Sequence, residues 1–177
     1  MDLLVVVDMQ NDFITGKLGT KEAQSIVDDV AKWTRKFKGH VIATMDTHSD
    51  IWYSKSQEGR KLPIPHCRIN TPGWCLEDKI YDAINLVAIS KVIQKNTFGS
   101  VDLIEHIEHI GVRDYDTVYF CGVCTDICVI SNALLFKSHF PELELKVVEN
   151  LCAGTTPENH DAALKIMESC QIERVKW

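Results

Sequence analysis

The sequence predicts a single α/β domain over residues 1–177, with a doubly wound, mostly parallel six-stranded sheet and helices on both faces. Continuous apolar runs recur along the chain, and such runs without alternation are typical of buried parallel strands. Amphipathic segments lie between most of these runs. A strand–helix alternation of this kind indicates crossover connections in a Rossmann-like, three-layer domain.

The first strand is expected in the β-branched run "LLVVVD", and the last in "IERVKW" at the end of the sequence. The strands between them follow the same apolar pattern. In order, the expected strands cover residues 3–8, 40–46, 86–91, 116–122, 144–149 and 172–177.

The helices are expected where apolar residues recur at helical spacing and where capping residues mark the ends. Ser100 and Gly111 suit the two ends of one helix, and Thr156 followed by Pro157 suits the start of another. The expected helices cover residues 20–38, 100–111, 125–139 and 156–170. Residues 49–80, rich in proline and glycine, are expected to form a long irregular loop, which in a compact domain is usually functional.

Composition excludes several classes of protein. A net charge of −6 gives no basic surface for nucleic acid, and no apolar run is long enough to span a membrane. Asp2 follows the initiator Met and "LLVVV" is too short for a signal peptide, so a cytoplasmic location is expected.

The seven cysteines also fit a reducing compartment, because their number is odd and the chain is large enough to bury a core without disulfides. No C-x-x-C pair is present, which disfavours a zinc ribbon. Most of these thiols are expected to be small buried hydrophobic groups.

Residues with reactive side chains follow the first four predicted strands. They are Asp8, then Asp46 and His48, then Lys95, then the octapeptide "GVCTDICV" at 122–129. Each has an ordinary alternative, since an Asp after a strand is often a turn former and a loop Lys is usually solvated. Ligands of parallel sheets nevertheless bind beyond the carboxyl ends of the strands, so these residues are expected to meet at one edge.

The octapeptide holds Cys124 and Cys128, which could be core residues, metal ligands, a disulfide or a nucleophile. In the first turn of a helix, Cys128 would have a lowered thiol pKa, and a nearby Lys95 would lower it further. Asp8 could take the thiol proton and pass it to a leaving amine. These groups suit acyl transfer.

The segments "VVVDMQNDF", "DTHSD", "PHC", "KNTFGS" and "GVCTDICV" together resemble the isochorismatase-like cysteine hydrolases, and within them the nicotinamidases. The resemblance covers nearly the whole chain. It implies a catalytic triad of Asp8, Lys95 and Cys128. It also implies a cis peptide between Val123 and Cys124, with the backbone N–H groups of Cys124 and Cys128 as the oxyanion hole.

The same resemblance implies one divalent metal ion, bound by Asp46, His48 and His66. Two imidazoles and a carboxylate suit zinc best, with manganese, iron or magnesium as alternatives. Glu58 or Ser54 could supply a further ligand. The substrate ring is expected near Phe13, Phe98, Trp52 and Val123. Trp74 is a further candidate. This chain departs from the family at Leu62, where family members often have Trp.

The leading hypothesis is an amidohydrolase that converts nicotinamide to nicotinate and ammonia through a thioester, in salvage of pyridine nucleotides. An alternative is a related amidase that acts on a carbamoyl or ureido compound without metal. Another is a catalytically idle binding protein of the same fold. The partner expected is a small aromatic amide, and the resemblance allows a homo-oligomer.

Overall fold

The computed structural model describes residues 1–177, apart from the side chain of Arg113. It contains one six-stranded sheet, in which every neighbouring pair of strands is parallel and the order is β3-β2-β1-β4-β5-β6. This confirms the predicted fold class. The strands are β1 Asp2–Val7, β2 His40–Asp46, β3 Ser90–Lys95, β4 Thr117–Val123, β5 Glu144–Ala153 and β6 Glu173–Val175.

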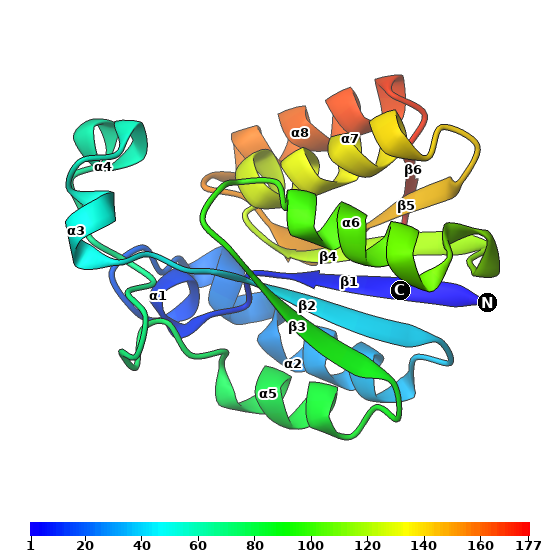
Figure 1. The fold of residues 1–177 in the computed structure, drawn as a ribbon, viewed down its shortest axis with the longest axis horizontal. Helices are drawn as coiled ribbons and strands as arrows, with labels where there is room; N and C mark the ends of the chain where they lie inside the picture. Colours follow the sequence, from blue (N-terminus) through cyan, green and yellow to red (C-terminus); the bar gives the residue numbers. More distant parts are fainter.

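Helices cover both faces of the sheet (Figure 1). α2 and α5 lie on one face, and α6, α7 and α8 lie on the other. Shorter helices lie beyond the carboxyl ends of the strands, where α3 and α4 project from the body of the molecule. The helices are α1 Asn11–Ile14, α2 Lys21–Lys36, α3 Asp50–Tyr53, α4 Gln57–Lys61, α5 Asp78–Asn85, α6 Val101–Ile110, α7 Ile130–His139 and α8 Pro157–Ser169, with a 3-10 turn at Val112–Asp114 and a π-helical turn at Thr125–Val129.

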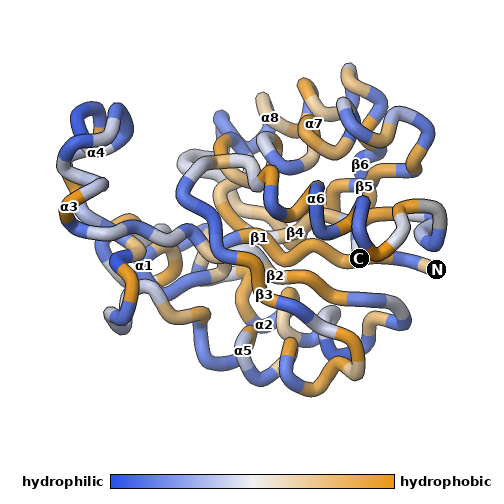
Figure 2. Tube along the Cα trace, in the orientation of Figure 1, coloured by the Kyte–Doolittle hydropathy of each residue, from blue (hydrophilic) through white to orange (hydrophobic). Residues whose placement is uncertain are grey.

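The core is built on β1, whose residues from Leu3 to Val7 are fully buried. Figure 2 shows the hydrophobic stretch that runs along this central strand. Helices on both faces exclude water from it, which is why the strand carries apolar residues without alternation. In the part of the chain that the structure describes, no helix is both long and apolar enough to cross a membrane.

Two expectations about local structure were wrong. The third strand is formed by residues 90–95 and not 86–91, so Lys95 ends the strand and does not follow it. The stretch 49–80 is not irregular throughout, since it contains α3, α4 and the start of α5. Helix α5 begins at Asp78 and is capped by Glu77, whose carboxylate accepts hydrogen bonds from the N–H groups of Lys79 and Ile80.

The strand order places β1 and β4 side by side at the point where the chain changes direction. After β1 the chain continues into α2 on one face, and after β4 it continues into α7 on the other. The carboxyl ends of these strands therefore lie where the strand order reverses, which is where ligands of such sheets bind.

Candidate active site

Asp8, Lys95 and Cys128 meet at the carboxyl ends of β1, β3 and β4, and all are buried. Lys95 Nζ lies 2.6 Å from Asp8 Oδ2 and 3.5 Å from Cys128 Sγ. The Thr44 hydroxyl donates a hydrogen bond of 2.7 Å to Asp8 Oδ1, which fixes the carboxylate from its other side. The ammonium group is thus held between a carboxylate and a thiol in a site shielded from water.

Burial raises the pKa of Asp8, although the Lys95 ammonium opposes the shift. Burial also raises the pKa of the Cys128 thiol well above its ordinary value, and Asp8 raises it further while Lys95 opposes both. The sequence led us to expect a lowered pKa for the Cys128 thiol. This expectation was wrong for a site in which Asp8 is charged. A carboxyl group with a raised pKa is suited to exchange a proton with a neighbouring thiol.

Cys128 lies in the π-helical turn Thr125–Val129, which separates β4 from α7. The peptide bond between Val123 and Cys124 is cis, as the sequence resemblance implies. The carboxylate of Asp126 accepts hydrogen bonds from the backbone N–H and the hydroxyl of Thr155, at 2.8 and 2.5 Å. This anchors the turn to the end of β5. The two cysteines of the octapeptide are both free thiols.

Asn132 of α7 is a fully buried polar residue that sequence reasoning missed. Its Nδ2 donates to the carbonyl of Cys128 at 2.8 Å and to the carbonyl of Phe98 at 3.2 Å. Its Oδ1 accepts from the N–H of Ser100 at 2.9 Å. One side chain thus connects the turn that carries Cys128 to the loop that follows Lys95.

We expect Asn132→Ala to lower kcat by about tenfold to a hundredfold, because small displacements of a reacting group have effects of that size. The buried carbonyl of Cys128 and the part-buried carbonyl of Phe98 would lose this donor, so the melting temperature should fall as well. Asn85→Ala is a matched control, since Asn85 is an exposed residue at the end of α5. Equal kcat values in both variants, measured well below their melting temperatures, would contradict a positioning role.

Four potential metal ligands converge beside this group. One ligand atom each from Asp46, His48, Glu58 and His66 lies within 4.8 Å of all the others. Glu58 of α4 therefore joins the three residues named from the sequence, whereas the Ser54 hydroxyl donates to the carbonyl of Ile51 and is exposed. Lys95 Nζ lies 3.9 Å from Asp46 Oδ1, so this cluster and the Asp8–Lys95–Cys128 group form one continuous site.

The donor chemistry of this cluster fits a divalent cation. His48 Nε2 lies 2.8 Å from Asp46 Oδ2, yet within the described residues neither ring nitrogen of the buried His48 has a hydrogen-bond partner. His66 Nδ1 is bonded to the carbonyl of Ile64 at 2.9 Å, and its Nε2 faces Asp46 Oδ2 at 3.4 Å and Glu58 Oε1 at 3.6 Å. Unsatisfied buried imidazole nitrogens are costly, and a metal ion would satisfy them.

Gln10 and Asp12 support the cluster from the segment after β1, and sequence reasoning gave neither a role. The Gln10 side chain accepts from the N–H of Asp46 at 2.7 Å and donates to its carbonyl at 2.8 Å. Asp12 Oδ2 accepts from the N–H of Cys67 at 2.8 Å, which holds the loop that carries His66. Gly73 permits this packing, because a Cβ there would lie 2.3 Å from the Asp12 carboxylate.

The four residues expected near the substrate ring differ in their burial and in their neighbours. Phe13 is half-buried, with its ring centroid 5.5 Å from that of His66. Trp52 stacks on His48 at 5.8 Å, and Phe98 is 49% exposed. Val123 is buried at the end of β4. Trp74 instead donates its indole N–H to the hydroxyl of Thr47 at 2.8 Å.

The reversal of strand order, the buried Asp–Lys–Cys group and the adjoining His/Asp/Glu cluster define a hydrolase site on a doubly wound sheet. Comparison with known families agrees, since residues 2–175 match the isochorismatase domain. The chain belongs to this family.

Individual relatives are similar over almost their full length. The chain is 29% identical over 191 residues to the nicotinamidase/pyrazinamidase of Mycobacterium tuberculosis, covering 99% of this chain and 98% of the relative. A structure of the pyrazinamidase of Pyrococcus horikoshii in complex with zinc is 29% identical, with a TM-score of 0.81 and 99% of each chain covered. The nicotinamidase of Bacillus subtilis, at 23% identity, shares the fold with a TM-score of 0.85 over 99% of each chain.

Proposed function

We propose that this protein hydrolyses nicotinamide to nicotinate and ammonia. The observation that carries the proposal is the position of Lys95, whose ammonium group lies between Asp8 and Cys128 and adjoins the metal-ligand cluster at Asp46. Relatives named nicotinamidase and pyrazinamidase, which match this chain over nearly its full length, support an aromatic amide as the substrate.

In the proposed mechanism, Asp8 removes the thiol proton as Cys128 attacks the amide carbon. The oxyanion is stabilised by the backbone N–H groups of Cys124 and Cys128, at the turn that follows the cis peptide. Asp8 then returns the proton to the departing ammonia and leaves a thioester, which water hydrolyses. Burial would lower the pKa of Lys95, but Asp8, Cys128 and Asp46 outweigh it, so the ammonium stays charged throughout.

The ligand cluster is proposed to hold one divalent ion, with zinc favoured by the two imidazoles and by the zinc complex of the Pyrococcus relative. Asp46, His48 and His66 would bind it, and Glu58 is placed to be the fourth ligand. Such an ion would bind the ring nitrogen of the substrate and orient the amide toward the thiol. Phe13 and Trp52 contact the rings of His66 and His48 and are proposed to pack against the substrate ring.

Ammonia release from nicotinamide by the zinc-loaded protein tests the proposed function directly. Benzamide is a matched comparison, because it carries the same carboxamide on a ring without nitrogen. We expect rapid hydrolysis of nicotinamide and much slower hydrolysis of benzamide. If no ammonia forms from nicotinamide but a ureido compound is hydrolysed, the alternative amidase is favoured. Inactivity toward both classes would favour an idle binding protein.

His66→Ala should remove the bound metal and lower kcat/KM by about a hundredfold or more. This loss exceeds the one typical for substitutions of residues that only hydrogen-bond to a metal ligand. Metal content per chain, measured after gel filtration, provides a readout that does not depend on activity. His109→Ala is the matched control, since His109 is an exposed residue of α6. Full activity of His66→Ala without metal would show that the reaction does not need the ion.

A further inference from the structure

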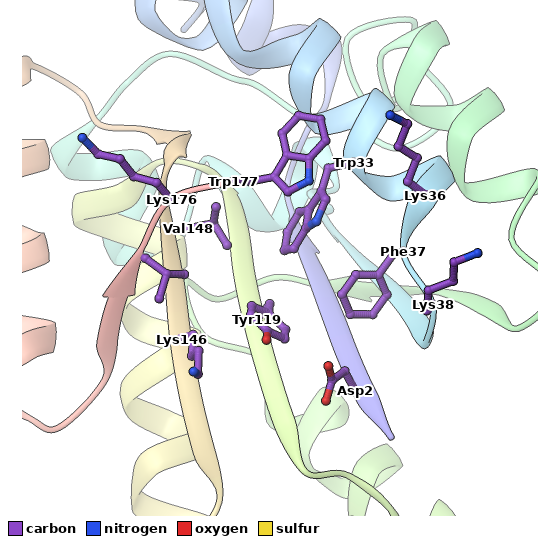
Figure 3. Close-up of a pocket in the computed structure, with 11 residues that line it drawn as sticks. Asp2, Trp33, Lys36, Phe37, Lys38, Tyr119, Lys146, Val148, Lys176 and Trp177 are labelled. Carbon is purple, nitrogen blue, oxygen red and sulfur yellow. The ribbon is translucent and has the colours of Figure 1, made fainter.

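A groove with a volume of about 430 Å³ lies far from the catalytic residues (Figure 3). It opens on the face of the sheet that carries α2, beside Trp33 and Phe37 at the carboxyl end of that helix. Asp2 and Lys146, near the starts of β1 and β5, place it toward the amino ends of the strands. The catalytic residues lie at the carboxyl ends, so the groove is a separate feature. Its volume falls in the range of small-molecule sites.

One wall of the groove is a preformed cluster of aromatic rings. The ring centroid of Trp33 lies 5.4 Å from Phe37, 5.7 Å from Tyr119 and 6.4 Å from Trp177. Trp177 is 41% exposed, but its backbone N–H and carbonyl are both hydrogen-bonded to the side chain of Asn150. A planar ring could therefore stack on a surface that is already ordered.

The rim of the groove is basic, although the chain as a whole carries a net charge of −6. Lys36, Lys38, Lys146 and Lys176 line it, and Asp2 is the acidic side chain among the lining residues. Lys146 pairs with Glu173 at 2.8 Å and Lys176 with Glu149 at 3.0 Å. No ion pair of Lys36 or Lys38 is present in the described part of the chain, so these two ammonium groups are the ones available to an anion.

We propose that this groove binds an aromatic phosphate of the mononucleotide class. The aromatic wall would receive the base, and Lys36 and Lys38 would receive the phosphate, which lysine binds as a mobile point charge. A second copy of this chain is a poorer occupant, because an isologous contact would bring the lysine rims of two copies together.

Binding of AMP to the full chain, measured by calorimetry and by quenching of tryptophan fluorescence, tests the proposal. AMP is expected to bind with a Kd below about 1 mM, and adenosine and inorganic phosphate at least about tenfold more weakly. The double variant Lys36→Ala/Lys38→Ala should lose the advantage of AMP over adenosine. Trp177→Ala should weaken the binding of AMP by about tenfold, which is the effect expected when a stacking partner is lost.

Lys165→Ala on α8 is the control for surface charge and should bind AMP normally, because α8 lies on the other face of the sheet. All variants should hydrolyse nicotinamide at the unaltered rate in the absence of AMP. A failure of AMP to bind the groove is therefore distinct from a failure of the protein to hydrolyse nicotinamide. The proposal is overturned if AMP does not bind, or if the Lys36→Ala/Lys38→Ala variant binds it normally. It is equally overturned if polyglutamate binds in place of AMP, or if sedimentation shows a dimer that Trp177→Ala dissociates.

Discussion

Cys128→Ala is expected to abolish hydrolysis of nicotinamide, whereas Cys124→Ala should keep activity within about tenfold of the unaltered protein. Cys128 Sγ lies 3.5 Å from the Lys95 ammonium, and no other thiol shares that contact among the described residues. An alanine side chain cannot attack the amide carbon. Loss of the nucleophile should therefore cost many orders of magnitude in kcat.

Cys124 has a different environment in spite of its similar place in the octapeptide. Burial and the neighbouring Asp126 raise the pKa of its thiol to about 12, so the side chain is a protonated, poor nucleophile at neutral pH. Its proposed contribution is the backbone N–H, which alanine also supplies. The turn should be kept, because the N–H groups of Ile127 and Val129 bond to the carbonyl of residue 124.

Cys128→Ser extends this test, because serine keeps the shape of the side chain but not its acidity. The same surroundings would ionise a hydroxyl far less than a thiol, so we expect turnover almost as low as in Cys128→Ala. Ammonia release at equal metal content is the measurement for all three variants. An inactive Cys124→Ala together with an active Cys128→Ala would reverse the assignment of the nucleophile.

Elements with a strong local signal were predicted well from the sequence. β1 lies in the centre of the sheet and is buried by helices on both faces, so its continuous apolar run clearly indicates a strand. β3 is the edge strand, and an edge can carry polar residues such as Lys91 and Gln94. The apolar run 86–91 was therefore a misleading signal, and the strand begins only at its end.

The proximity of Asp8, Lys95 and Cys128 could be predicted because topology brings strand ends together, and chemistry restricts which side chains can act as proposed. Gln10 and Asn132 were missed for a physical reason. Both act through hydrogen bonds to backbone groups that are distant in sequence, with Asp46 in one case and with Phe98 and Ser100 in the other. Only folding shows which polar groups are buried and need a partner. The same holds for the thiol pKa, since burial of Cys128 outweighs its neighbouring cation.

Lys95→Met is expected to lower kcat/KM by about a thousandfold or more, because it removes the only ammonium group that the described structure places between Asp8 and Cys128. Asp8 is fully buried, and Lys95 is the group that opposes the rise of its pKa. Without that cation the pKa of Asp8 should rise further. Since Asp8 must be ionised to act as the base, the acidic limb of the pH profile should move to higher pH.

The same substitution should destabilise the fold, since removing one partner of a buried ion pair typically costs about 3–5 kcal/mol. Lys95→Arg separates the effects, because arginine restores the positive charge but not the compact ammonium geometry. We expect Lys95→Arg to recover much of the melting temperature and little of the activity. The measurements are the melting temperature and the pH dependence of kcat/KM for both variants at a temperature where both are folded. Near-normal turnover in folded Lys95→Met, with an unmoved acidic limb, would remove Lys95 from the mechanism.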